Sequence, residues 1–205
     1  MSNPKTSLLV VVVALAAGSQ VSANLLTNPG FEDPIGPEWA FTIVSGGPTN
    51  WTSGVSSALF HSGANSYGMA YGPIGSTGKA YAEQLLSGLT PGDAYDVSGW
   101  LYFGWRADKD WAYIEAQGGG TPVQAPLKGA NVVGSWQQYA LSQTADAGGN
   151  LTVRLYLDKY GTSTADKTAW VYFDDMAVVE VIPEPTTLAL LALAGLAVVC
   201  RRRAA

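Results

Sequence analysis

The sequence predicts an all-β protein, folded as a jelly-roll β-sandwich of two antiparallel sheets. Gly, Ser, Thr and Pro recur at roughly eight- to twelve-residue intervals between positions 24 and 182, a turn spacing typical of sandwiches. The runs between these turns are short and alternate apolar with polar side chains, as strands with one face in a core do. No segment in this range sustains the apolar period of a helix. About eight such strands suit a jelly roll.

The strongest strand candidate spans residues 94–103 and follows a turn centred on Pro91 and Gly92. Its expected partner is 111–116, across a loop at 104–110. The other strands are expected at 39–43, near Trp51, and at 64–71, 80–85, 136–141, 151–158 and 169–181.

Alternation also predicts which side chains of two strands leave the core. In 94–103, one face carries Tyr95, Val97, Gly99, Leu101 and Phe103, and the other carries Asp96, Ser98, Trp100 and Tyr102. In 151–158, Val153, Leu155 and Leu157 are expected to point inward, and Arg154, Tyr156 and Asp158 outward. Trp39 and Trp51 are expected to pack in the core or against loops.

The first 23 residues have the composition of a secretory signal peptide. Lys5 precedes an apolar run at 8–17, and small residues stand at Val21 and Ala23, so that cleavage is expected before Asn24. The alternative is a buried first helix.

The last residues, 183–205, combine a break, an apolar run and a basic end. Pro183, Glu184 and Pro185 precede the run 188–200, and the arginines follow as Arg201, Arg202 and Arg203. A helix of this run would measure about 20 Å, which is short for a permanent membrane anchor. The arginines would hold the C-terminus in the cytoplasm.

This tail resembles the PEP-CTERM sorting signal. The resemblance implies recognition and removal by exosortase, a membrane protease of Gram-negative bacteria that make exopolysaccharide. It therefore implies Sec export to the cell surface or extracellular matrix, with the tail as a transient anchor in the inner membrane. A plain single-span transmembrane helix, permanently anchored, is the alternative.

The stretch 24–182 is one domain's worth of chain, and it is acidic. It contains seven Lys and Arg against fifteen Asp and Glu. Such a charge disfavours nucleic acid and anionic lipid as partners and leaves neutral sugars and cations. The chain's one cysteine, Cys200, lies in the tail, so the exported domain has no disulfide.

Five motifs occur in the order found in a known fold: Asn-Pro-Gly-Phe-Glu at 28–32, Ser-Gly-Ala-Asn-Ser-Tyr at 62–67, and the segments 88–100, 151–157 and 171–175. Together they resemble the galactose-binding-like jelly roll of carbohydrate-binding modules, especially the family 4/9 type. The resemblance covers nearly the whole domain. It implies the fold and a capacity for sugar binding, although this fold also serves structural roles.

Asp174 and Asp175 are adjacent carboxylates in an apolar run, and they need water, N–H donors or a cation. We expect them beside Glu32, with a shared metal. The resemblance implies a structural Ca²⁺ bound by Glu32, by Asp174 ahead of Asp175, and by backbone carbonyls of the loop that carries His61 and Asn65. Oxygen ligands of this kind suit Ca²⁺. The alternative is that Glu32 and Asp175 are exposed acids at strand ends.

Two further acidic pairs could hold a second ion, although solvated loops explain them as well. Asp108 and Asp110 form one pair, and Asp158 with Asp166 forms the other.

Seven tryptophans and ten tyrosines are many for this length, and a sugar platform or a sandwich core would use them. We expect the outward-facing members to contact a polysaccharide. The candidate contacts are Trp100, Tyr102, Trp105, Trp111, Arg154 and Tyr156, with Gln84 as a polar helper.

Catalysis is not expected. His61 is the only histidine, and no serine lies in a Gly-x-Ser-x-Gly elbow. Glu83 and Glu115 could serve as a glycosidase pair, but nothing in their context marks them.

The sequence thus predicts an exported, non-catalytic protein with a carbohydrate-binding-like domain, associated with exopolysaccharide or biofilm. A purely structural, calcium-stabilised surface protein and a glycoside hydrolase or lyase are the alternatives.

Overall fold

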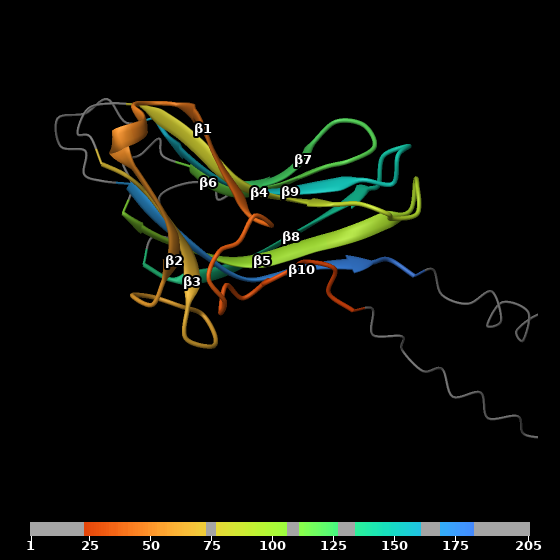
Figure 1. Cartoon of the computed structure of the whole chain (residues 1–205), viewed down its shortest axis with the longest axis horizontal. Helices are drawn as coiled ribbons and strands as arrows, with labels where there is room; N and C mark the ends of the chain where they lie inside the picture. Colours follow the sequence, from red (N-terminus) through yellow and green to blue (C-terminus); the bar gives the residue numbers. More distant parts are fainter. Residues whose placement is uncertain (1–22, 73–76, 106–110, 127–133, 161–168, 183–205) are drawn as a thin grey trace, which may run out of the picture.

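The protein is described by a computed structural model that covers residues 23–72, 77–105, 111–126, 134–160 and 169–182. Ten strands form two five-stranded antiparallel sheets stacked as a sandwich (Figure 1). The first, named here the β9 sheet, has the order β1 (Ala40–Ser45), β4 (Gly78–Leu86), β9 (Leu151–Lys159), β6 (Trp111–Gln117) and β7 (Val123–Pro126). The second, the β10 sheet, has the order β2 (Trp51–Ser56), β3 (Ser66–Tyr71), β10 (Ala169–Glu180), β5 (Ala94–Trp105) and β8 (Trp136–Thr144). A single 3₁₀ turn, η1 (Pro48–Asn50), joins β1 to β2.

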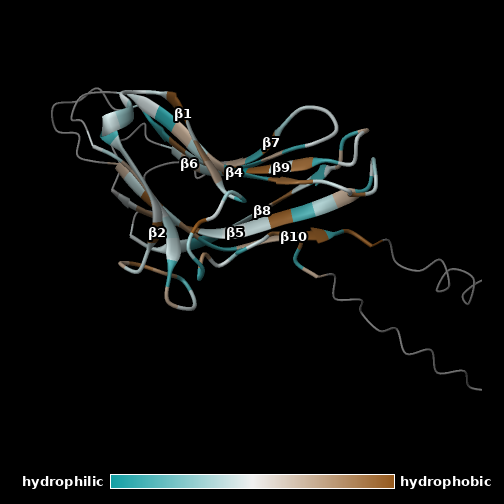
Figure 2. Ribbon diagram, viewed as in Figure 1, coloured by the Kyte–Doolittle hydropathy of each residue, from teal (hydrophilic) through white to brown (hydrophobic). Residues whose placement is uncertain are grey.

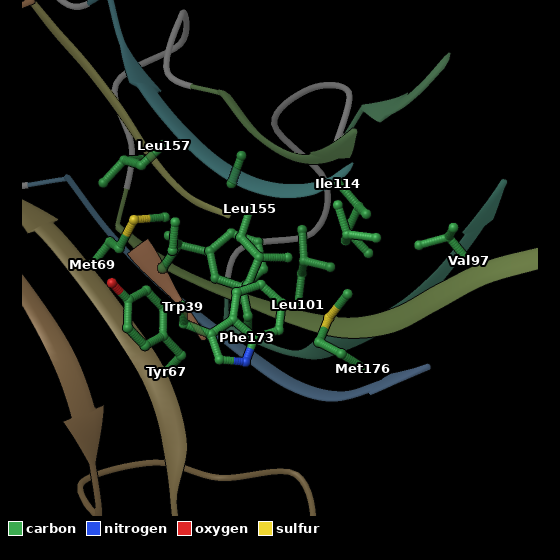
Figure 3. Close-up of a cluster of buried hydrophobic side chains, with 14 of the residues drawn as sticks. Trp39, Tyr67, Met69, Val97, Leu101, Ile114, Leu155, Leu157, Phe173 and Met176 are labelled. Atoms are coloured by element: carbon green, nitrogen blue, oxygen red, sulfur yellow. The ribbon is translucent and has the colours of Figure 1, made fainter. Parts of the chain in front are cut away.

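The core lies between the two sheets, where alternate side chains of the strands meet. Val153, Leu155 and Leu157 of β9 are fully buried, and so are Val97 and Leu101 of β5. Figure 3 shows Leu155 and Leu157 lying above Leu101 and Phe173, and Figure 2 shows the hydrophobic residues gathered along β9 and β10. The predicted inward and outward faces of 94–103 and 151–158 are therefore confirmed. Trp39 and Trp51 are buried, as predicted.

β10 changes its inward parity part-way along. Val171 and Phe173 point into the core before the bulge, whereas Met176 and Val178 are buried after it. The pairing of β10 with β5 shifts register between Asp174 and Ala177, and Asp175 has a φ of 46°. A bulge of this kind inserts one residue and moves the following side chains to the other face.

The expected pairing of 94–103 with 111–116 is wrong. β5 pairs with β10 and β8, while β6 pairs with β9 and β7, so the connection after β5 crosses from one sheet to the other. Strand β7 was not expected either. It is four residues long, lies at the edge of its sheet and ends at Pro126, and edges are where strands tolerate proline.

Several sequence predictions fall outside the described residues. They are residues 1–22 of the signal peptide predicted at 1–23, the acids Asp108, Asp110 and Asp166, and the sorting helix and arginines within 183–205. Within the described ranges, no helix has the length and hydrophobicity needed to span a bilayer.

Gly99 of β5 faces the core, where a Cβ would overlap the sulfur of Met176 and lie 3.3 Å from Cδ1 of Ile114. We expect Gly99→Ala to lower the free energy of unfolding by about 1–3 kcal/mol, because the site is already filled. Gly72→Ala is the control, since its Cβ would lie 3.7 Å from the Asn50 carbonyl oxygen, an ordinary contact. Equal urea midpoints for the two variants would contradict the packing described.

Candidate functional site

The segment before β1 runs beside β10. The backbone N–H of Leu25 donates to the carbonyl of Val178 at 2.9 Å, and that of Met176 donates to Pro29 at 2.9 Å. The Asn24 side chain donates to the Met176 carbonyl and accepts from Val178 N–H. The structure therefore brings the Asn-Pro-Gly-Phe-Glu motif next to the Asp-Asp pair, as expected.

Asp174 is fully buried and accepts three backbone N–H bonds. Its Oδ2 accepts from His61 at 2.7 Å and from Ser62 at 3.2 Å, and its Oδ1 accepts from Asp175 at 2.7 Å. Burial raises the pKa of Asp174, and the three N–H donors offset only part of that rise. The loop at 61–65 is thus held over β10 by a desolvated carboxylate.

Asp175 holds the same loop through side chains. Its Oδ2 lies 2.7 Å from His61 Nδ1, and its Oδ1 accepts from the Ser62 hydroxyl at 2.6 Å. The imidazole of His61 stacks on Trp100, with ring centroids 3.9 Å apart. His61 therefore fixes the loop to the outer face of β5.

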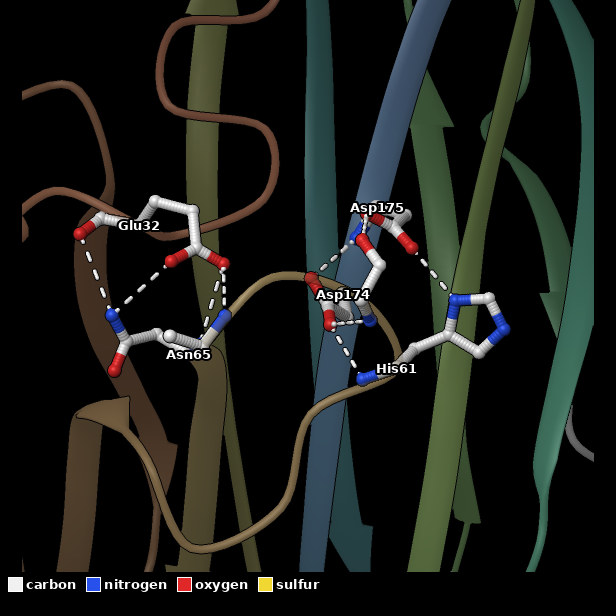
Figure 4. A network of polar contacts seen from close by, with 7 residues as sticks. Glu32, His61, Asn65, Asp174 and Asp175 are labelled. Carbon is white, nitrogen blue, oxygen red and sulfur yellow. Dashed lines mark hydrogen bonds and ion pairs between the residues drawn. The ribbon is translucent and has the colours of Figure 1, made fainter.

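Glu32 binds the far end of the loop (Figure 4). Its Oε1 accepts from the backbone N–H of Ala64 at 2.9 Å and of Asn65 at 3.3 Å, and Asn65 Nδ2 lies 3.4 Å from its Oε2. Gly63 lies between the part of the loop that Asp174 and Asp175 hold and the part that Glu32 holds. It has a φ of 65°, and a side chain there would collide with the Glu32 carboxylate.

The predicted Ca²⁺ requires oxygen ligands from this loop, but the loop turns N–H groups toward the carboxylates. Both Asp174 oxygens and the Glu32 Oε1 accept backbone N–H bonds. These N–H groups occupy the loop-facing side of the Asp174 and Glu32 carboxylates. Among the residues that the structure describes, no three His, Cys, Asp or Glu are grouped to hold a metal. The calcium site stays a prediction.

Removing the Asp174 carboxylate leaves three N–H groups without an acceptor. We expect Asp174→Ala to lower the free energy of unfolding by about 3 kcal/mol, since each buried unsatisfied donor costs about 1–3 kcal/mol and the loop can relax. Asp175→Asn is the matched control. Asn tolerates the positive φ and keeps an acceptor for Ser62, so the loss should stay below about 1 kcal/mol. Similar chemical denaturation curves for both variants would refute this assignment.

Calcium removal tests the same cluster without a mutation. Because N–H groups already satisfy the carboxylates, the melting temperature is expected to be unchanged by EDTA and by added CaCl₂. A melting temperature that rises with CaCl₂ would mean that the loop binds the ion through its carbonyls.

The outer face of the β9 sheet carries a second group of polar and aromatic residues. Tyr81, Tyr156 and Tyr113 stand side by side on β4, β9 and β6. Tyr113 and Tyr156 are stacked at 4.6 Å, and Tyr81 lies 5.0 Å from Tyr156. Burial, followed by the nearby Glu115 carboxylate, raises the pKa of Tyr156 to about 12, so its hydroxyl stays protonated as a donor.

In the next row, Arg154 lies between two carboxylates. Its Nε donates to Glu83 Oε2 at 2.8 Å, and its Nη1 donates to Glu115 Oε1 at 3.1 Å and to Gln117 Oε1 at 2.6 Å. Burial alone would lower the pKa of Arg154, but these carboxylates outweigh it and raise it. The guanidinium is thereby fixed in one orientation.

Grooves lie on both sides of these rows. One, of about 460 Å³, is lined by Glu83, Arg154, Thr152 and Leu85 together with Pro37. The other, of about 320 Å³, is lined by Lys79, Trp111, Tyr113, Gln124, Asp158 and Tyr160. Both place an aromatic or aliphatic surface beside hydrogen-bonding groups, as ligand sites do.

The sequence-predicted contacts divide between opposite sides of the sandwich. Trp100 and Tyr102 lie on the outer face of the β10 sheet, whereas Trp111, Arg154 and Tyr156 belong to the outer face of the β9 sheet. The side chain of Trp105 lies outside what the structure describes.

Two of the predicted side chains bond other groups of the protein. Gln84 is 3% exposed and forms two bonds with the Thr27 backbone, because it falls on the inward parity of β4. It anchors the N-terminal segment from the floor of the groove that Glu83 and Arg154 also line. Asp158, considered for a second ion, pairs with Lys79 at 3.3 Å.

Sequence reasoning missed Tyr81, Tyr113 and Lys79 as members of the β9-sheet face. Lys79 and Tyr81 alternate with Ala80 and Ala82 on β4, which was a usable signal. Tyr113 gave no such signal, since five consecutive residues of β6 are buried.

Comparison with known proteins identifies the C-terminal segment. A profile of the PEP-CTERM protein-sorting motif matches residues 181–203. The chain carries a PEP-CTERM sorting motif. That motif implies export and membrane-associated sorting by exosortase. No curated protein matches the chain.

Solved structures similar to the sandwich include carbohydrate-binding modules. TmCBM61, solved with β-1,4-galactotriose, has a TM-score of 0.58 at 17% identity and covers 78% of this chain and 100% of its own. The CBM22-1 xylan-binding domain of Paenibacillus barcinonensis Xyn10C has a TM-score of 0.51 at 15% identity, with 79% and 97% covered. The Stig cyclase Fisc from Fischerella sp. TAU, an enzyme, has a TM-score of 0.54 at 18% identity, with 78% and 98% covered. At these identities the likeness establishes the fold, which serves both binding and catalysis.

Proposed function

We propose that this protein is an exported, non-catalytic polysaccharide-binding protein that works at the cell surface or in the extracellular matrix. The observation that carries the proposal is the outer face of the β9 sheet. There the row of Tyr81, Tyr156 and Tyr113 adjoins the row in which Arg154 lies between Glu83 and Glu115.

Sugar recognition needs apolar ring surface beside fixed hydrogen-bonding groups. Trp111 is 42% exposed at one end of this face and Tyr81 is half-buried, so these two rings are accessible. Tyr113 and Tyr156 are only 6% and 7% exposed and mainly hold the accessible groups in place. Arg154, Gln117 and Gln124 offer N–H donors, and Glu83 offers carboxylate oxygens. The side chains are oriented by one another, which reduces the entropy lost on binding.

The same network argues against glycoside hydrolysis. A glycosidase needs two carboxyl groups free to reach the scissile bond. Here Glu83 and Glu115 are both engaged by the guanidinium that lies between them. The arrangement is suited to holding a sugar hydroxyl and not to moving a proton.

The sorting motif supports the cellular setting of the proposal. A tail recognised by exosortase would deliver the domain to the envelope, where exopolysaccharide is the abundant ligand class. The predicted signal peptide at 1–23 and removal of 183–205 complete this route.

Binding is tested with xylan and β-1,4-galactan as soluble probes in affinity electrophoresis. We expect Arg154→Ala to weaken binding about tenfold or more, because truncating an anchoring Arg typically costs above 1 kcal/mol. Lys79→Ala is the comparison variant. It removes the other basic residue of the same face, which lines the second groove and forms one ion pair where Arg154 forms two, so its loss of affinity should be smaller.

Retention of both probes by Arg154→Ala at the wild-type level would contradict this site. A folded protein that binds neither probe nor any glycan on an array would favour a purely structural surface protein. Release of reducing ends, abolished by Glu83→Gln or Glu115→Gln, would favour a hydrolase.

A further inference from the structure

The outer face of the β10 sheet carries a connected set of rings that the β9-sheet site does not use. It consists of Trp136 on β8, Trp100 and Tyr102 on β5, Trp170 and Tyr172 on β10, and His61 on the loop above them. We name these six residues the aromatic array. None of them belongs to the buried core, and each ring is partly exposed or lies at the surface.

The rings of the array contact one another in sequence. His61 stacks on Trp100 and meets Trp136 edge-on, with centroids 5.6 Å apart. Tyr102 meets Trp136 edge-on at 5.6 Å and lies parallel to Trp170 at 5.9 Å. Trp170 in turn meets Tyr172 edge-on at 5.3 Å. The contacts hold the rings in fixed orientations across three neighbouring strands.

Trp170 lies flat against the sheet. A Cβ on Gly104 would overlap its six-membered ring, so the indole covers the β5 backbone where that residue has no side chain. One ring face therefore packs on the sheet and the opposite face is turned away from it. A planar apolar surface of this kind binds the C–H face of a sugar.

A groove of about 230 Å³ continues from Trp170 and Tyr172 toward β2. Its other walls are Thr52, Ser53, Gly54, Val55, Ser56, Gly68, Met69 and Ala70. No lining side chain is charged, although the domain is strongly acidic. Ser53 is already hydrogen-bonded to the buried Tyr67. The hydroxyls of Thr52 and Ser56 are the groups of this groove that can bond the hydroxyls of an uncharged ligand.

The array and the groove together cross all five strands of the sheet. Neighbouring strands lie about 4.8 Å apart, so the distance from β8 to β2 is roughly 19 Å. A surface of that length is longer than one sugar unit and suits an extended chain of several sugars.

We propose that the outer face of the β10 sheet is a second glycan-binding face, which takes an uncharged polysaccharide along the aromatic array. The ligand class rests on the proposed function, whereas the site is independent of the β9-sheet face. The two faces are the opposite outer surfaces of one sandwich. One molecule therefore bridges two polysaccharide chains.

The test compares binding with bridging, using xylan and β-1,4-galactan as probes. Wild-type protein is expected to bind a probe and to increase its light scattering as chains are cross-linked. Trp170→Ala and Gly104→Ala should each still bind through the β9-sheet face and lose the increase in scattering. Gly104→Ala retains every ring of the array and only displaces Trp170, so it separates ring position from ring removal.

A second readout uses the tryptophans of the array. Both probes are expected to protect Trp100, Trp136 and Trp170 fluorescence from acrylamide quenching in Arg154→Ala, which lacks the β9-sheet anchor. Unchanged quenching with both probes, or full cross-linking by Trp170→Ala, overturns the second face. A concentration-dependent dimer that Trp170→Ala abolishes also overturns it, since the array would then bind a second copy of this chain.

The outcomes distinguish this inference from the proposed function. If Arg154→Ala binds as wild type and Trp170→Ala loses all binding, the β9-sheet site fails and the second face stands. If Trp170→Ala binds and cross-links as wild type while Arg154→Ala does not bind, the second face fails and the proposed function stands. Melting temperatures of all variants confirm that each is folded.

Discussion

The carboxylate of Asp174 is the point at which separate segments of the chain are held together. A buried carboxylate is costly unless donors surround it, and here the donors are backbone N–H groups of the 61–62 turn and of Asp175. The bulge that supplies one of these donors also returns Met176 and Val178 to the core. The turn in turn places His61 on Trp100. Core packing and surface geometry therefore depend on one satisfied charge.

Much of the fold was predictable because alternation is a local property of each strand. Val153, Leu155 and Leu157 occupy the faces expected of them, as do Trp100 and Tyr102 on the outside. Which strands become neighbours is not local, so the hairpin between 94–103 and 111–116 was wrong. The parity change at Asp175 was equally hidden, because a bulge depends on what the neighbouring loop donates.

The candidate site shows the same division. The sequence indicated that Glu32 and the Asp pair lie together, and it indicated that they need partners. It could not distinguish N–H donors from carbonyl ligands, because every peptide unit of the loop offers both. Gln84 shows a related limit of local patterns: its amide could bond a ligand or the chain, and in the structure both ends of the amide bond the Thr27 backbone. The sequence pattern shows that a side chain points outward but not from which sheet. The predicted ligand contacts on the outer faces of the β9 and β10 sheets were therefore grouped as one site.

The two outer faces carry different chemistry. The β9-sheet face uses charges that orient one another around Arg154, and the β10-sheet face uses rings that pack on one another. The fold itself is shared by sugar-binding modules and by a cyclase, so function follows from these side chains and not from the sandwich.

The antiparallel bonding of Leu25 and Asn24 to Val178 has a mechanical consequence. Any pull on the chain beyond Ile182 enters the domain at the end of β10, the central strand of its sheet. There β10 is hydrogen-bonded to β5 on one side and to the first residues of the domain on the other. A force along β10 therefore loads the hydrogen bonds on both of its sides at the same time. The hydrogen bonds of an edge strand would instead break one after another. A domain tethered by its last strand would keep its shape while its outer surfaces carry the load.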